Sequence, residues 1–287
     1  MIEKYINRTE FDSYEDLKNN YRVTVPADFN FAYDIVDAWA KEDPYKPALL
    51  YCNDNGERRL YTFCDMALMS NRAANYFLSL GIGKGDRVLL MLKQRVEAWV
   101  CILALCKIGA VCIPATFQLT EKDIVYRCNA AEVKAVITVA DKNITDSVIA
   151  SLPKCKTVLH YAVVGDKIPE GASDFRKDYS GCSDVLERIP NLSSDPMLMY
   201  FSSGTTGMPK MILHSYAYPL GHIITAKFWQ QTEEGKLHLT MSDSGWAKFG
   251  WGKIYGQWIC GATIFCYDMD KFIPLKLLEK LEHYKVT

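Results

Sequence analysis

The residue types best suited to chemistry in this chain lie together in one short segment, residues 199–210. A short apolar run leads into a loop of hydroxyl-bearing residues and glycines that ends in a lysine. Glycine lets the backbone N–H groups approach an anion closely, and hydroxyls donate hydrogen bonds to phosphate oxygens. The lysine adds a compact positive charge. The segment therefore predicts a phosphate-binding loop made of Ser202, Ser203, Gly204, Thr205, Thr206, Gly207, Met208, Pro209 and Lys210.

Two other kinds of phosphate-binding loop do not fit this segment. A P-loop needs Gly-Lys followed by Ser or Thr, whereas Lys210 follows Pro209 and precedes Met211. A P-loop and a dinucleotide fingerprint also open a helix, but residues 211–213 have the pattern of a strand. Judged on residue types alone, a flexible Ser/Gly surface loop remains the simpler alternative.

The elements that must position this loop alternate between apolar strands and helices. This alternation favours an α/β fold in which a largely parallel sheet is covered by helices. In the first part of the chain we expect helices over residues 31–41, 64–80, 96–108, 121–130 and 144–152. The strands expected there are residues 48–52, 59–63, 87–92, 111–114, 135–139 and 157–161.

A weakly patterned segment rich in Gly, Pro, Ser and Asp, residues 165–194, separates this part from the next. We therefore predict one α/β subdomain over residues 1–195 and a second over residues 196–287. The run Lys285–Thr287 has the character of another strand, so we expect the second subdomain to be incomplete. Its expected strands are residues 197–201, 211–214, 237–241 and 263–267, and its expected helices are 217–231 and 274–283.

Composition narrows the class of protein. Hydrophobic residues make up 49% of the 287 residues, charged residues 23%, and the formal net charge is −1, a balance typical of a globular protein. We expect neither nucleic acid nor a membrane as partner, because no long basic block exists and the longest apolar stretch, residues 98–115, is interrupted by Lys107 and Pro114.

Cysteine and histidine usage adds an expectation about the environment. The ten cysteines form no Cys-x-x-Cys motif and lie mostly in apolar runs, so we interpret them as reduced core thiols. The five histidines lack the spacing of metal ligands, and no protein-ligated metal is predicted. With no apolar signal region at the N-terminus, these features predict a cytoplasmic protein.

Several segments resemble one known superfamily. Residues 200–210 resemble the phosphate-binding signature of the adenylate-forming enzymes, which include acyl-CoA synthetases, peptide-synthetase adenylation domains and luciferases. Residues 81–92 and 105–114 are similar to two earlier segments of these enzymes. The Ser-Asp-Ser-Gly-Trp run at residues 242–246, followed by residues 250–258, most resembles the acetyl- and medium-chain acyl-CoA synthetase branch.

The resemblance implies a fold, ligands and residue roles. The chain would be most of the large N-terminal domain of an acyl-CoA synthetase, without its mobile C-terminal domain. Residues 202–210 would bind the phosphates of ATP, with Lys210 and Thr205 acting in catalysis and Thr205 and Thr206 nearest to Mg²⁺. Trp246 would border the acyl pocket and the path of the CoA thiol, although a core aromatic is the alternative. Asp243 could brace the loop that carries Trp246, but a solvated or capping carboxylate is the better interpretation. His214 is better interpreted as a packing residue.

The resemblance also implies a reaction. A carboxylic acid would attack ATP to give acyl-AMP and pyrophosphate, and CoA would then displace AMP, so the expected ligands are a small acid, ATP and CoA. The family's adenine, ribose and hinge motifs have no match here. We therefore expect the 287-residue chain to be inactive alone, and its exposed sheet edge to favour a homodimer. An enzyme that loads a carrier protein, or a non-catalytic nucleotide-binding or interaction module, remains an alternative.

Overall fold

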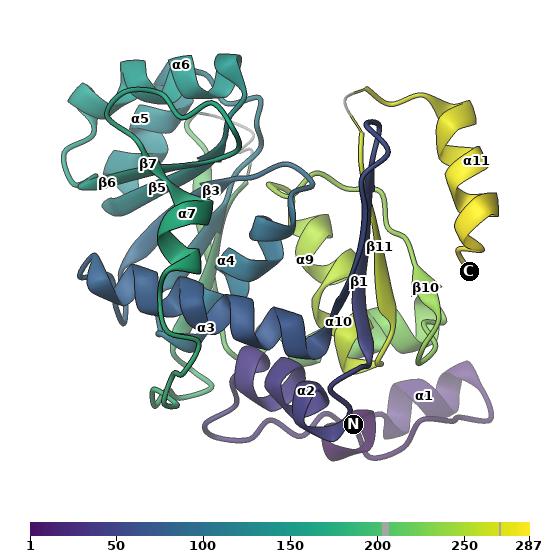
Figure 1. Cartoon of the computed structure of the whole chain (residues 1–287). Coiled ribbons are helices and arrows are strands. Elements are labelled where there is room, and N and C mark those ends of the chain that lie inside the picture. The colour runs from purple at the N-terminus through teal and green to yellow at the C-terminus, as the bar shows by residue number, and fades with distance from the viewer. Residues whose placement is uncertain (203–206, 270) are drawn as a thin grey trace.

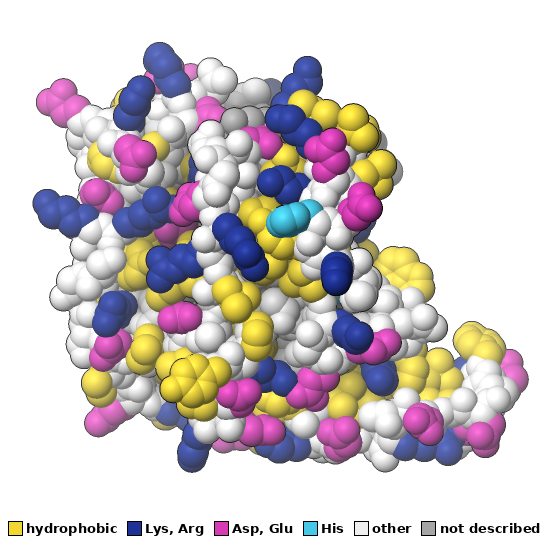
Figure 2. Space-filling view, turned by 45° about the vertical axis from the view of Figure 1, so that its right-hand side comes forward, with side chains coloured by type: hydrophobic (Ala, Val, Ile, Leu, Met, Phe, Trp, Pro, Cys, Tyr) yellow, Lys and Arg dark blue, Asp and Glu magenta, His cyan; other side chains and the backbone are white. Residues whose placement is uncertain are grey.

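The structure, a computed structural model, describes residues 1–202, 207–269 and 271–287. Within these ranges the strands form two sheets with helices packed around and between them (Figure 1). No helix in the described ranges has the length and apolar character needed to cross a membrane. On the face drawn in Figure 2, basic and acidic side chains are interspersed, not separated into regions of one sign.

The larger sheet contains most of the parallel strands that the sequence predicts. Its strand order is β7-β6-β5-β3-β4-β8-β9, and every neighbouring pair is parallel except β8 and β9. The antiparallel β8–β9 hairpin closes one edge of the sheet. The strands are β3 (Arg87–Met91), β4 (Val111–Pro114), β5 (Val133–Val139), β6 (His160–Val164), β7 (Ser173–Asp174), β8 (Pro196–Ser202) and β9 (Lys210–Ser215).

The smaller sheet joins the two ends of the chain. Its order is β10-β11-β1-β2, and β1 pairs in parallel with β11 although more than 200 residues separate them, as Leu49 opposite Ile264 shows. Strands from both sides of residue 195 therefore share each sheet, and the subdomain boundary at that residue stays a prediction. The strands are β1 (Pro47–Asn53), β2 (Arg58–Thr62), β10 (Leu237–His238) and β11 (Thr263–Asp268).

Helices fill the space between the sheets and cover their outer faces. Helix α4 (Val96–Lys107) is buried along its whole length, which explains its nearly continuous apolar sequence. It lies between the sheets beside α9 (Ala247–Lys253) (Figure 1). The ring centroids of Trp99 and Phe249 are 4.6 Å apart. Helices α3 (Phe63–Ser79) and α5 (Glu121–Ala130) begin with capping boxes, whose side chains satisfy free backbone N–H groups.

The remaining helical segments include short ones that the sequence analysis did not anticipate. They are η1 (Ile2–Lys4), α1 (Tyr14–Asn20), η2 (Ala32–Asp37), α2 (Ala38–Glu42), α6 (Lys142–Ser151), η3 (Leu152–Lys154), α7 (Phe175–Ser180), α8 (Tyr218–Gly221), η4 (Thr225–Trp229), α10 (Tyr255–Ile259) and α11 (Pro274–Tyr284). No residue of α11 is buried in this chain.

Four expected elements differ from the structure. The helix expected over residues 31–41 consists of the π-helix η2 followed directly by α2. The single helix expected over residues 217–231 is divided into α8 and η4, because the chain turns at His222 after the short helix that begins at Tyr218. The strand expected over residues 237–241 pairs only at residues 237–238, as it lies at the edge of the smaller sheet. The strand expected at residues 157–161 begins at His160.

Candidate functional site

The β8–β9 hairpin brings the two ends of the phosphate-loop candidate together. Ser202, the last residue of β8, is paired with Lys210, the first residue of β9. Gly207 has a φ of +93°, a left-handed conformation that favours glycine. The expected strand after Lys210 is confirmed, and this strand-loop-strand arrangement differs from the loop-to-helix arrangement of a P-loop. Ser203, Gly204, Thr205 and Thr206 lie outside the described residues.

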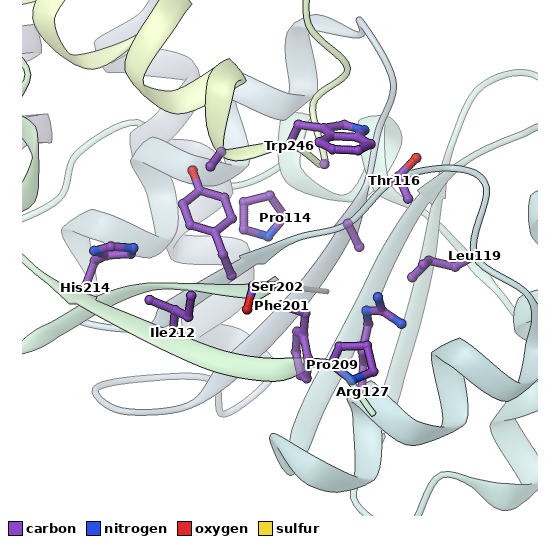
Figure 3. A pocket seen from close by; sticks show the side chains of 14 residues that line it. Pro114, Thr116, Leu119, Arg127, Phe201, Ser202, Pro209, Ile212, His214 and Trp246 are labelled. Carbon is purple, nitrogen blue, oxygen red and sulfur yellow. The ribbon is translucent and has the colours of Figure 1, made fainter. Parts of the chain in front are cut away.

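A cavity of about 490 Å³ opens beside the ends of this loop (Figure 3). Ser202 and Pro209 form part of its wall. Trp246 lines the same cavity, although it lies in a separate segment further along the chain. The structure thus brings three of the residues singled out from the sequence to one place. The lining residues are Pro114, Ala115, Thr116, Leu119, Arg127, Tyr200, Phe201, Ser202, Pro209, Ile212, His214, Gly245, Trp246 and Ala247.

Trp246 is held at the cavity by a tight turn, not by burial. The residue is 61% exposed in this chain, so it is not packed into the core formed by the described residues. The backbone N–H of Trp246 donates to the carbonyl of Asp243 at 3.1 Å. The Asp243 carboxylate accepts from the backbone N–H of Gly245 at 2.9 Å, so it caps the turn and at the same time braces the loop that carries Trp246. Burial raises the pKa of Asp243.

Gly245 allows this turn to rest directly on the end of β4. A Cβ atom at this position would lie 2.0 Å from the backbone nitrogen of Thr116 and 2.1 Å from the carbonyl carbon of Ala115. Such distances are far shorter than van der Waals contact, so a glycine is required here. The glycine therefore lets the backbone of the Trp246 turn form a continuous wall with residues 114–116.

The opposite wall is aromatic. His214 lines the cavity. The centroid of its ring lies 4.2 Å from the ring centroid of Tyr218 and 5.8 Å from that of Tyr200. Burial lowers the pKa of His214, which favours the neutral imidazole. His214 packs as the sequence analysis expected, but it also faces the cavity.

Arg127 is a functional candidate that the sequence analysis missed. It reaches the cavity from α5, and its guanidinium lies 5.2 Å from the centre of the Phe201 ring at the end of β8. The neighbouring Tyr126 hydroxyl donates to the carbonyl of Pro209 at 2.9 Å, so α5 also supports the far end of the loop. No distinguishing signal marked it in the sequence, because Arg127 is one of several polar side chains on an ordinary amphipathic helix.

A metal site built from protein side chains is not found within the described ranges. No group of three or more His, Cys, Asp or Glu side chains there is arranged to hold a metal ion. Among the described residues, the cavity lining likewise contains no carboxylate.

Comparisons with known proteins agree on one family. The model of the AMP-binding enzyme family matches residues 36–287. The acyl-coenzyme A synthetase ACSM3, mitochondrial, of Pongo abelii is 32% identical over 292 residues, covering 98% of this chain and 50% of the relative. The corresponding ACSM5 of Homo sapiens is 32% identical over 273 residues, covering 93% and 47%. This chain thus spans about half the length of these curated relatives.

A solved structure shows the same fold. The anthranilate CoA ligase AuaEII, crystallised in complex with anthranoyl-AMP, superposes with a TM-score of 0.81 at 21% sequence identity. The match covers 92% of this chain and 49% of that protein. It confirms the expected α/β architecture of an adenylate-forming ligase.

These relatives contradict one expectation from the sequence. We predicted a cytoplasmic protein, but the similar synthetases are named as mitochondrial enzymes. The prediction was wrong because its reasoning tested only for an apolar secretory signal and for disulfide chemistry. Neither feature distinguishes one thiol-reducing compartment from another.

Proposed function

Because this chain belongs to the AMP-binding enzyme family, we propose that it forms the phosphate-binding and acid-binding part of an ATP-dependent acid–CoA ligase. The supporting observation is the shared cavity, where both ends of the Gly/Thr loop meet Trp246. A phosphate-binding loop beside an apolar, partly aromatic wall suits a reaction that joins a carboxylate to a nucleotide. The named synthetases among its relatives support the same reaction class.

The proposed reaction has two steps. In the first, a carboxylate oxygen attacks the α-phosphorus of ATP, the bond to the bridging oxygen breaks, and pyrophosphate leaves with its electron pair. In the second, the CoA thiol loses its proton and attacks the acyl carbon, and AMP leaves. Both steps need positioning and charge neutralisation more than covalent help from side chains.

Each residue of the site has a proposed task in this scheme. Lys210 and Thr205 would stabilise charge on the phosphates, while the remaining hydroxyls and backbone N–H groups from Ser202 to Pro209 would orient them. Mg²⁺ would arrive with the triphosphate and neutralise part of its charge. Trp246 would contact the acyl chain and border the path of the CoA thiol.

We further propose that the 287-residue chain does not complete this reaction alone. The described residues that line its cavity include no carboxylate for the ribose hydroxyls, and the relatives are about twice as long. Exposed apolar side chains on and before α11, including Phe272, Leu275 and Leu278, would favour self-association of the isolated chain.

The test is acid-dependent ATP–pyrophosphate exchange in a full-length protein that contains this chain. A panel of acetate, butyrate, octanoate and benzoate covers short, medium and aromatic acids. Exchange that requires one of these acids would support the proposed adenylation. Exchange that is absent with all acids, in a folded protein that still binds ATP, would refute it.

A further inference from the structure

Lys253, the last residue of α9, is a buried lysine that forms no salt bridge within the described ranges. Asp243 interacts with it electrostatically from a distance greater than that of an ion pair. Its exposure is 2%, and its ammonium nitrogen donates to the side-chain carbonyl of Gln94 at 2.8 Å. The rings of Trp99 and Phe249 each lie 5.6 Å from the same nitrogen. By contrast, the other fully buried lysine in these ranges, Lys107, pairs with Asp37 at 2.8 Å. Burying an ammonium without a direct ion pair is costly, so the contact with Gln94 calls for a role besides stability.

Lys253 determines the orientation of the Gln94 side chain. A lysine ammonium only donates hydrogen bonds, so the amide oxygen of Gln94 must face it. The amide nitrogen then points the other way and donates to the backbone carbonyl of Ser242, which only accepts. The backbone of Gln94 is also fixed, since the Cys266 thiol donates to its carbonyl at 3.2 Å. The Gln94 amide therefore links Lys253 to the backbone of Ser242 through two hydrogen bonds, an arrangement called here the Lys253–Gln94–Ser242 relay.

Ser242 begins the segment that carries Trp246. Residues 242–246 separate the cavity beside the phosphate loop from a second cavity of about 430 Å³, whose lining includes Gln94, Ser242, Asp243 and Lys253. Within the segment, the turn closed by Asp243 fixes Gly245 and Trp246 relative to Ser242. Anchoring the Ser242 carbonyl consequently anchors the whole partition between the two cavities.

We propose that Lys253 and Gln94 are positioning residues that hold the 242–246 segment in place and thereby set the position of Trp246 at the phosphate-loop cavity. The structural part of this inference stands on the hydrogen bonds alone. Its consequence for catalysis rests on the proposed function of the cavity. Neither residue touches the cavity that contains Trp246, so neither is a catalytic residue.

Two substitutions separate positioning from simple packing. Lys253→Met removes the ammonium but keeps an apolar chain of similar length, and such replacements of buried charges are often neutral or stabilising. Gln94→Glu keeps an acceptor for Lys253 and creates an ion pair, but an ionised carboxylate cannot donate to the Ser242 carbonyl. Lys107→Met is the control, because it removes an equally buried lysine that has no contact with the 242–246 segment.

The readout is the nanosecond anisotropy decay of Trp246 in the 287-residue chain. Each variant is measured with and without Trp246→Phe, so that the difference isolates Trp246 from the other five tryptophans. We expect Lys253→Met and Gln94→Glu to increase the amplitude of the fast component about twofold, because a segment released from its anchor moves on this timescale. Lys107→Met should leave it unchanged. Unchanged Trp246 motion in folded Gln94→Glu would overturn the proposal, even if Lys253→Met failed to fold.

An activity measurement extends the test to the full-length protein. Both variants should raise the KM for the acid roughly tenfold while leaving the KM for ATP unchanged, as expected for a displaced pocket wall. An equal rise in both constants would point to a general structural defect and would contradict a specific positioning role. If the wild-type protein shows no exchange at all, the proposed function fails, whereas the anisotropy result still decides whether the relay exists.

Discussion

Replacing Gly245 with alanine should displace the Trp246 turn, because the new methyl group would point into backbone that cannot yield. The Cβ atom would lie 2.0 Å from the Thr116 nitrogen, 2.1 Å from the Ala115 carbonyl carbon and 2.5 Å from its oxygen. Ordinary contact begins at 3.4 Å, so the separation must grow by about 1.4 Å. Residue 115 is tied into the larger sheet through its N–H bond to Leu90 at 2.8 Å, and the 242–246 segment must therefore move instead.

The displacement has two measurable consequences. Overpacking of this kind costs about 1–3 kcal/mol in the free energy of unfolding. In the full-length protein, moving a substrate-contacting wall by about 1 Å should lower kcat/KM for the acid by on the order of 10²-fold. The first effect is measured by urea unfolding of the 287-residue chain, and the second by acid-dependent pyrophosphate exchange.

Gly83→Ala is the matched control for Gly245→Ala. A Cβ atom at Gly83 would meet nothing within 4 Å, and its backbone has no left-handed φ. This variant should change the free energy of unfolding by no more than about 0.5 kcal/mol. If Gly245→Ala behaved like Gly83→Ala in both assays, the contact between the turn and the end of β4 would not determine the position of Trp246.

Four further predictions concern charge, specificity, pH and completeness. In the full-length protein, Lys210→Ala should slow pyrophosphate exchange on the order of 10²-fold by removing a charge at the phosphates, and Gly204→Val should impair the same step sterically; wild-type rates in both would reject the phosphate assignment. Trp246→Ala should change the rank order of an acid panel more than the KM for ATP, by roughly 1–3 kcal/mol between acids that differ by one methylene; an unchanged order would remove Trp246 from the pocket. Burial, with a smaller contribution from His214, lowers the pKa of His222 to about 4. The unfolded chain takes up this proton near pH 6.5 and the folded chain does not, so the free energy of unfolding should fall as pH drops from about 6.5 to 4. His222→Gln should reduce that fall by about 1–3 kcal/mol, as measured by urea unfolding at each pH. Finally, the 287-residue chain alone should release pyrophosphate only at background with acetate, butyrate, octanoate or benzoate, and turnover of any of them would show that it carries a complete site.

The sequence predicted the larger sheet well because its strands carry their own signal. Strands β3, β4 and β5 are buried and therefore appear as continuous apolar runs, and the helices between them are bounded by residues such as Thr120 and Gly109. The smaller sheet could not be predicted in this way. Its central pairing joins β1 to β11, and no local pattern indicates which of several distant strands will become neighbours.

The site was predicted only in part, for the same reason. Residues 202–210 were recognised from their composition and Trp246 from a resemblance. That they lie at one cavity depends on tertiary contacts, which no local pattern indicates. Arg127 gave no distinguishing signal. Lys253 gave a weak signal, since it interrupts the largely apolar run of residues 249–260. Lys107 interrupts the apolar run of α4 in the same way, and both lysines are buried. Lysines that interrupt buried segments merit attention as anchoring groups.

The most direct test of the shared site is a crystal structure of the full-length protein with a non-hydrolysable acyl-adenylate analogue. We predict that the phosphate mimic contacts the loop of residues 202–210 and that the acyl chain lies against Trp246, in the cavity lined by Pro114 and His214. An analogue bound instead in the second cavity, beside Lys253 and Phe272, or away from both cavities, would contradict the proposed site.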